Sequence, residues 1–246
     1  MKRKKILCLG GTGAMGVYLV PELLSMGYEV HVAALDGFSL LPLRDPHLTC
    51  MQCDVKEETR LRAILQEGYD AIVDFMLYGT KEFKERHTLL LEHTDHYIFL
   101  SSYRVYADSP VPITEESPRL LDVSEDEEFL ASEDYALYKA RQEDILKQSS
   151  FSNWTVIRPA ITYSKRRFQL TTLEASVVVY RMVHGKKLIL PEGALPIQGT
   201  MTWAGDVAKM IARLVLNRKA YRDVFTVSTS EHHTWEEIAQ MYQKIG

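Results

Sequence analysis

The chain begins with short apolar runs that alternate with a helix-like segment. A four-residue apolar run at 6–9 leads into a glycine-rich turn, and residues 17–26 then carry apolar side chains at helical spacing. Residues 29–35 form another short run, rich in valine and alanine, which is typical of a buried strand. The first 35 residues therefore predict the order strand, helix, strand.

The same alternation continues to residue 157. We expect further strands at 48–53, 71–75, 97–100 and 154–157, and helices at 57–66, 81–92 and 133–148. Because parallel neighbours need crossover connections, this order predicts an α/β fold with a doubly wound, Rossmann-like parallel sheet covered by helices on both faces. Residues 1–160 are expected to form this dinucleotide-binding core.

The order of elements becomes less regular beyond residue 160. We expect helices at 173–182, at 206–216 and from 235 onward, with strands at 188–190 and 224–227. Residues 161–246 are therefore interpreted as a small C-terminal substrate-binding lobe that is interleaved with the core. An acidic run at 114–134 predicts a solvated loop or exposed helix, and a lid over the active site is the alternative.

Composition narrows the class of protein. With 246 residues, 46% of them apolar, the chain can bury one well-formed core with a small appended lobe. The net charge is −4 and the cations are dispersed beyond the basic N-terminus, so we expect no nucleic-acid partner. No apolar run approaches the roughly eighteen residues that a membrane span needs, and we expect a cytoplasmic protein without membrane contact.

The cysteines and histidines point to no metal site. Three cysteines cannot build a disulfide framework, and Cys50 and Cys53 are expected to be buried structural thiols in a strand. The histidine pairs at 93 and 96 and at 232 and 233 lack further ligands at zinc-like spacing.

A glycine motif follows the first predicted strand and precedes the first predicted helix. Glycines in this context permit a tight turn and let the backbone approach a pyrophosphate, whose charge meets free N–H groups and the positive end of the helix. A turn of the same kind without a ligand is the alternative. The residues expected to bind a dinucleotide here are Gly10, Thr12, Gly13, Ala14, Met15 and Gly16.

The choice between NAD and NADP depends on the end of the second strand. Asp36, twenty residues beyond Gly16, favours NAD because a carboxylate there binds a free ribose hydroxyl. Asp36 could equally form a turn with Gly37, so NADP is not excluded. Asp54 follows the third strand and is placed to accept a hydrogen bond from the adenine amino group, with helix capping as the alternative.

Two elements carry candidate catalytic side chains. Tyr135 and Lys139 are four residues apart in a predicted helix, so they share a face, and the ammonium can favour the ionised phenol. Tyr135 would then be the general acid/base. Ser101 and Ser102 follow the strand at 97–100, where a hydroxyl can polarise a carbonyl, although serines at such a position also form turns.

The sequence resembles the extended short-chain dehydrogenase/reductases, the NAD-dependent epimerase/dehydratase family. The resemblance runs in order through residues 10–16, 53–55, 69–74, 101–106, 135–139, 156–159 and 206–208. It implies that Ser102 orients a substrate hydroxyl or carbonyl, that Tyr135 moves the proton, and that Lys139 also holds the nicotinamide ribose. A hydride would pass between a substrate carbon and the nicotinamide.

Several positions depart from the family pattern. Ala34 stands at the usual NAD-selecting carboxylate, and Leu35 at the arginine of NADP-preferring members. Ile161 replaces an asparagine that helps to hold sugar nucleotides, and Gly199 replaces an arginine that often meets their pyrophosphate. The chain is also shorter than most extended members, so part of the substrate lobe is expected to be missing.

Three function classes remain open. The first is an NAD(P)-dependent epimerase or dehydratase that acts by hydride transfer on a sugar or nucleotide-sugar. The second is a reductase of a small carbonyl substrate, and the third is a dinucleotide-binding protein without turnover. In the first two a small molecule is the partner, and the resemblance also implies a homodimer formed through helices.

Overall fold

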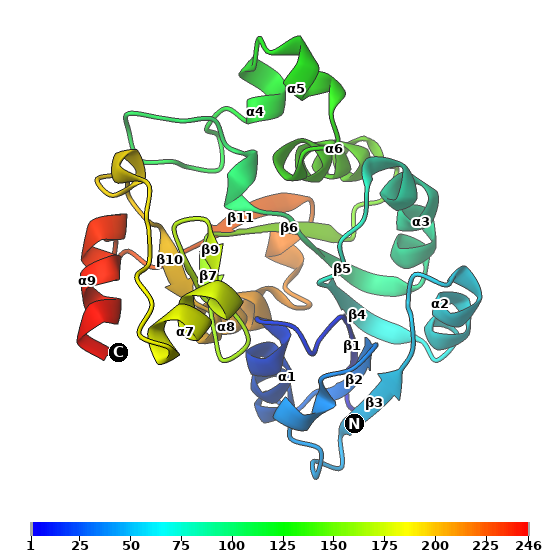
Figure 1. The fold of residues 1–246 in the computed structure, drawn as a ribbon. Coiled ribbons are helices and arrows are strands. Elements are labelled where there is room, and N and C mark those ends of the chain that lie inside the picture. The colour runs from blue at the N-terminus through cyan, green and yellow to red at the C-terminus, as the bar shows by residue number, and fades with distance from the viewer. Residues whose placement is uncertain (1, 246) are drawn as a thin grey trace.

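The computed structural model describes residues 2–245, which are built around a seven-stranded parallel sheet (Figure 1). The strand order is β11-β6-β5-β4-β1-β2-β3, and every neighbouring pair runs parallel. The bounds are β1 (Lys5–Leu9), β2 (Glu29–Ala34), β3 (Leu48–Gln52), β4 (Tyr69–Asp74), β5 (Thr94–Leu100), β6 (Trp154–Pro159) and β11 (Asp223–Val227). The predicted doubly wound α/β fold is confirmed, and its order reverses between β1 and β4, where open sheets of this kind bind ligands.

Helices cover both faces of the sheet because alternate side chains of each strand point to opposite faces. One apolar core packs α1 (Gly16–Ser25) and α8 (Ala204–Leu214) against one face, with Ile6 and Cys8 of β1 in it. Leu7 and Leu9 belong to the core on the other face. That second core includes side chains from α2 (Glu58–Leu65), α3 (Thr80–Glu92) and α6 (Tyr135–Gln148).

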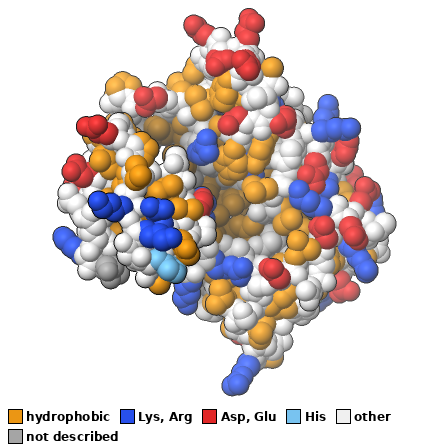
Figure 2. Space-filling model, viewed as in Figure 1, with side chains coloured by type: hydrophobic (Ala, Val, Ile, Leu, Met, Phe, Trp, Pro, Cys, Tyr) orange, Lys and Arg blue, Asp and Glu red, His pale blue; other side chains and the backbone are white. Residues whose placement is uncertain are grey.

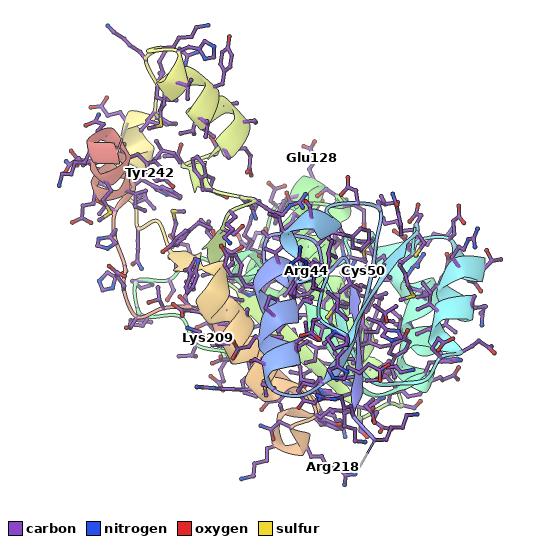
Figure 3. All side chains as sticks on the ribbon, turned by 90° about the horizontal axis from the view of Figure 1, so that it is seen from below. Arg44, Cys50, Glu128, Lys209, Arg218 and Tyr242 are labelled. Carbon is purple, nitrogen blue, oxygen red and sulfur yellow. The ribbon has the colours of Figure 1, made fainter. Side chains whose placement is uncertain are left out.

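Residues beyond β6 contribute both to the sheet and to a separate small layer. Strand β11 and helix α8 lie with the core, whereas α7 (Ala175–Val183) and α9 (Trp235–Ile245) project from it (Figure 3). Leu170, Val178, Trp235 and Ile238 form the buried centre of this layer. Its short strands are β7 (Ile161–Tyr163), which pairs with β10 (Met201–Trp203), and β8 (Gln169–Leu170), which pairs with β9 (Leu173–Glu174).

Some predicted elements differ from the structure. The strand expected at 188–190 is irregular, and the four short strands β7 to β10 were not predicted, since two or three residues carry too little periodicity. The acidic run carries two short, largely exposed helices, α4 (Leu120–Val123) and α5 (Glu127–Ala131). Short 3-10 turns are η1 (Phe38–Leu40), η2 (Tyr103–Val105), η3 (Glu192–Ala194) and η4 (Arg218–Ala220).

The prediction that Cys50 and Cys53 are buried thiols of one strand was wrong, and Cys53 lies just beyond the end of β3. Cys50 is exposed and Cys53 is only partly buried, because β3 is the edge strand of the sheet. Among the helices of residues 2–245, none is long and apolar enough to cross a membrane.

Candidate active site

The glycine turn between β1 and α1 leaves little room for side chains. Gly10 has a φ of +69°, in the left-handed region that favours glycine. A Cβ at Gly16 would overlap the backbone of Gly11, so this glycine lets the helix pack closely on the turn. A Cβ at Gly13 would meet only the Gly10 carbonyl oxygen, at 3.3 Å, so the remaining directions around it are open.

The turn also presents backbone donors at the start of α1. Gly13 donates to the Gly10 carbonyl oxygen at 3.0 Å, whereas the amides of Thr12, Ala14 and Met15 have no acceptor in the part of the chain that the structure describes. Amides before a helix, together with the helix dipole, favour an anion. The space around Gly13, together with backbone N–H groups that have no acceptor, therefore fits the pyrophosphate of a dinucleotide.

The second strand ends beside this turn. Ala34 is buried, and Asp36 is exposed, with a carboxylate that accepts no hydrogen bond from residues 2–245. Asp54, after β3, accepts a hydrogen bond from the Lys56 amide at 2.9 Å, which is a local turn contact. The helix capping given above as its alternative is not seen, since the residue that precedes α2 is Glu57 and no side chain caps the helix. The adenine contact of Asp54 stays a prediction.

The candidate catalytic side chains meet at the carboxyl edge of the sheet. Tyr135 is the first residue of α6, where Asp134 caps the helix by accepting the Ala136 amide at 2.8 Å. Ser102 follows β5, and its Oγ accepts a hydrogen bond from the Arg104 amide at 3.2 Å, which is the turn role given above as its alternative. The same hydroxyl is close enough to the Tyr135 phenol to lower its pKa. Lys139 lies one turn further along α6, and its Nζ donates to the Leu100 carbonyl oxygen at 2.7 Å. The structure thus brings together all three predicted catalytic residues.

Burial dominates the acid–base properties of the site. It raises the pKa of Tyr135, against the opposing effects of the Ser102 hydrogen bond and of the Arg167 and Arg104 charges. The expectation that Lys139 lowers this pKa is not met, because the ammonium bonds to Leu100 instead. Burial lowers the pKa of Lys139 to about 8, against the charges of Asp74 and Glu143.

Asp74 is a buried carboxyl group that the sequence analysis missed. It ends β4 and is 1% exposed. The hydroxyls of Tyr97 and Tyr78 donate to its Oδ2 at 2.8 and 3.1 Å, and the Met76 amide donates to Oδ1 at 2.9 Å. Burial raises the pKa of Asp74 despite these bonds. An acidic residue ending an apolar strand was the available signal.

A second group that the sequence analysis missed is Glu143, which joins α6 to the ends of β5 and β6. It is fully buried, and it accepts hydrogen bonds from Ser101 at 2.5 Å and from Arg158 at 2.6 and 2.9 Å. Arg158 is also buried. Of the two serines after β5, Ser101 therefore serves this buried ion pair, and Ser102 faces Tyr135.

A cleft of about 850 Å³ lies between the loops of the core and the C-terminal layer, and it reaches Tyr103, the residue after Ser102. Ser102, Tyr135 and Lys139 are not among its lining residues. The surface is hollowed where these two parts meet (Figure 2). Tyr103 and Tyr106 line one side, and hydroxyl-bearing residues at 226–230 line the other. None of the residues described as lining it is lysine or arginine. At Gly199 a side chain would press on α9, since a Cβ would lie 2.8 Å from Ile238.

Comparisons with known proteins agree with this geometry. The model of the NAD(P)H-binding family matches residues 10–218. WbmH of Bordetella bronchiseptica, solved with NAD+, superposes with a TM-score of 0.77 at 17% identity, over 99% of this chain and 81% of that one. WbmG of the same organism, solved with NAD and UDP, has a TM-score of 0.74 at 18% identity, over 99% and 78%. UDP-glucose 4-epimerase of Thermus thermophilus, solved with NAD, has a TM-score of 0.70 at 19% identity, over 98% of this chain and 82% of that one.

A curated relative is the chloroplast stem-loop binding protein of 41 kDa b of Arabidopsis thaliana, which is 26% identical over 99% of this chain. The chain spans 63% of that relative's length. The family match covers most of the chain, and the fold is that of NAD-dependent epimerases. The chain therefore belongs to the NAD(P)H-binding family, and its resemblance to the extended short-chain dehydrogenase/reductases is confirmed.

Proposed function

We propose that the chain is an NAD(P)-dependent enzyme of the epimerase/dehydratase type that acts on a sugar, with Tyr135 as its acid/base. The observation that carries this proposal is the position of Tyr135 beside Ser102, where that hydroxyl lowers the pKa of the phenol, with the buried Lys139 one turn further along α6, at the sheet edge that also bears the glycine turn. The buried ammonium of Lys139 and the partly buried phenol of Tyr135 both have shifted pKa values, which is typical of a functional site.

The chain's own groups can handle the proton of a hydride-transfer reaction. The nicotinamide, when bound, supplies the hydride acceptor or donor. Ser102 would hydrogen-bond the substrate oxygen, and Tyr135 Oη would give that oxygen a proton or take one from it. Because burial raises its pKa, the resting Tyr135 is a phenol, the form that donates when a carbonyl is reduced. Lys139 would hold the nicotinamide ribose.

The lining of the cleft supports a sugar as substrate. Hydroxyls at Ser228 and Ser230 can bond to sugar hydroxyls, and Tyr103 adds an aromatic ring to the lining. The Tyr106 and Thr226 hydroxyls are already bonded to each other at 2.6 Å. The Bordetella protein WbmG was solved with UDP, which points to a nucleotide-sugar, whereas the cleft lining here has no lysine or arginine to bind a diphosphate. Because the lining belongs to this chain, we give it more weight and propose a sugar without a diphosphate.

That same lack of cations favours a second candidate, a reductase of a small carbonyl substrate. The two candidates differ in whether the reaction consumes the cofactor. An epimerase returns the hydride to the same molecule and leaves the cofactor unchanged, whereas a reductase consumes NADH or NADPH in a 1:1 ratio with product.

The test is to incubate the purified protein with each dinucleotide and a panel of sugars, nucleotide-sugars and small carbonyl compounds. Product is followed by NMR, and cofactor by its absorbance. A changed sugar with unchanged cofactor supports the first candidate, and stoichiometric oxidation supports the second. A product that forms equally well with the Tyr135→Phe variant would contradict both.

The expected partner is a small molecule. Stem-loop binding, named for the Arabidopsis relative, is outside this proposal because the net charge of −4 and the dispersed cations do not suit a phosphate backbone. The cytoplasmic location, the homodimer and the two-part division at residue 160 stay predictions.

A further inference from the structure

A hairpin from the C-terminal part of the chain lies against the cofactor-binding half. It consists of residues 164–167, closed by backbone hydrogen bonds between Ser164 and Arg167, and carries three consecutive cations. The Lys165 amide donates to the Tyr18 hydroxyl of α1 at 3.4 Å. The hairpin therefore rests on the helix that begins at the glycine turn.

The three cations have different surroundings. Lys165 lies over the Tyr18 ring, 5.8 Å from its centre, and Arg167 forms an ion pair with Glu174 at 3.3 Å. Arg166 has no carboxylate within 4.0 Å in the described part of the chain. Its Nη1 donates to the Gly37 carbonyl oxygen at 3.4 Å, and a Cβ at Gly37 would collide with the same guanidinium.

Arg166 is thus a cation held over the end of β2 with most of its N–H donors unspent. This strand end is where nucleotide-binding sheets of this kind meet the 2′ position of the adenosine ribose. The residues that usually make the selection are apolar here, since Ala34 is buried and Leu35 carries no charge. Asp36 lies at the same end, with its carboxylate exposed.

We propose that Arg166 binds the 2′-phosphate of NADP(H), and that the chain prefers NADP(H) to NAD(H) for this reason. A guanidinium can give two parallel hydrogen bonds to a phosphate, in addition to its charge. The cation reaches the strand end from a loop about 130 residues further along the chain, so the motif at the end of β2 does not reveal it. This inference concerns cofactor binding and does not depend on the reaction.

The test is calorimetric titration of NADH, NADPH and adenosine 2′,5′-bisphosphate into the wild type and four variants. Arg166→Ala should lower the affinity for NADPH and for the bisphosphate by roughly tenfold to a hundredfold, and it should leave the affinity for NADH within about twofold of the wild type. Arg166→Lys should recover part of the lost affinity, because lysine restores the positive charge but cannot give two parallel hydrogen bonds to the phosphate. Lys165→Ala is the matched control and should change neither dinucleotide.

The fourth variant separates the roles of the two charges at this strand end. Asp36→Asn should raise the affinity for NADPH, because it removes a negative charge near the phosphate. If Asp36→Asn instead lowers the affinity for NADH, Asp36 selects NAD and the inference is overturned. Equal or tighter binding of NADH by the wild type overturns it too, as does an equal loss of both dinucleotides in Arg166→Ala. Retained NADH binding reports that each variant is folded.

Discussion

Tyr135 is partly buried at the start of α6, and its position beside Ser102 is the most specific feature of the site. Replacing Tyr135 with Phe removes the proton and leaves the ring, so turnover should fall by about 10²- to 10⁴-fold while dinucleotide affinity stays within about twofold. Initial rates and a binding titration check this. Tyr138→Phe is the control, since that ring packs edge-on against Tyr135 with centres 5.3 Å apart. The proposed role fails if Tyr138→Phe is the more damaging change.

Lys139 is a buried ammonium whose pKa falls from 10.5 to about 8 on folding. Below pH 8 it is charged in both states, and its burial cost is fully present. Between pH 8 and 10.5 the unfolded chain binds more protons, so this group makes the protein more stable as pH rises. At about 1.4 kcal/mol per pH unit, the gain is on the order of 3 kcal/mol.

The Lys139→Met variant isolates this effect, because every other titrating group is common to both proteins. The free energy of unfolding, measured in urea at pH 7 and pH 10, should shift in favour of the wild type by that order of magnitude. Parallel pH curves for the two proteins would mean that Lys139 has an ordinary pKa in the folded state.

At the residue scale, sequence reasoning worked where spacing alone sets proximity. Helical spacing placed Tyr135 and Lys139 on one helix, and the end of a parallel strand placed Ser102 beside them. It failed where burial decides the chemistry, because the sequence does not say which of many carboxylates is enclosed. Asp74 and Glu143 were missed for that reason.

Among the elements, the turn before α1 depends on a close approach that one methyl group disrupts. Gly16→Ala would push a Cβ into the Gly11 backbone and should lower the free energy of unfolding by about 1–3 kcal/mol. Gly13→Ala is the matched control, because its Cβ would meet only the Gly10 oxygen at 3.3 Å. Thermal and urea unfolding of both variants check this. Similar losses in both would mean that the turn is not packed as described.

Helix α6 is fixed to the sheet by the buried pair Glu143 and Arg158. Glu143→Gln keeps the shape but leaves the guanidinium without its counter-charge, and it should cost about 3–5 kcal/mol in unfolding free energy. Glu128→Gln, at an exposed position on α5 (Figure 3), is the control and should leave stability unchanged. If the two variants unfold alike in urea, the pair does not hold the helix.

The elements that the sequence predicted correctly are those with several turns or a full apolar run, such as α1, α3 and β4. Their apolar side chains belong to the two cores that lie on opposite faces of the sheet. Five or more residues are enough for the apolar pattern to show whether a segment is a helix or a strand. Strands β7 to β10 have two or three residues each, and they form only because the C-terminal layer packs around them. Pattern alone could not have found them.

At the scale of the whole molecule, the strand order places the parts of the site. The reversal between β1 and β4 puts the glycine turn next to Asp74, and β5 and α6 bring Ser102 and Tyr135 to the same edge. The predicted α/β alternation indicated a doubly wound parallel sheet, but it did not predict this strand order. The contact of the hairpin at 164–167 with Gly37 joins parts of the chain 129 residues apart, so no local sequence pattern could predict it.

The measurement that tests the account most directly is a titration of NAD, NADH, NADP and NADPH into the wild type, Tyr135→Phe and Gly13→Asp. The Gly13→Asp variant puts bulk and negative charge where the pyrophosphate should lie. We predict that at least one dinucleotide binds the wild type and Tyr135→Phe with similar affinity, and that Gly13→Asp abolishes this binding. Binding that survives in Gly13→Asp, or no binding of any of the four to the wild type, would contradict the assignment of the glycine turn as the cofactor site.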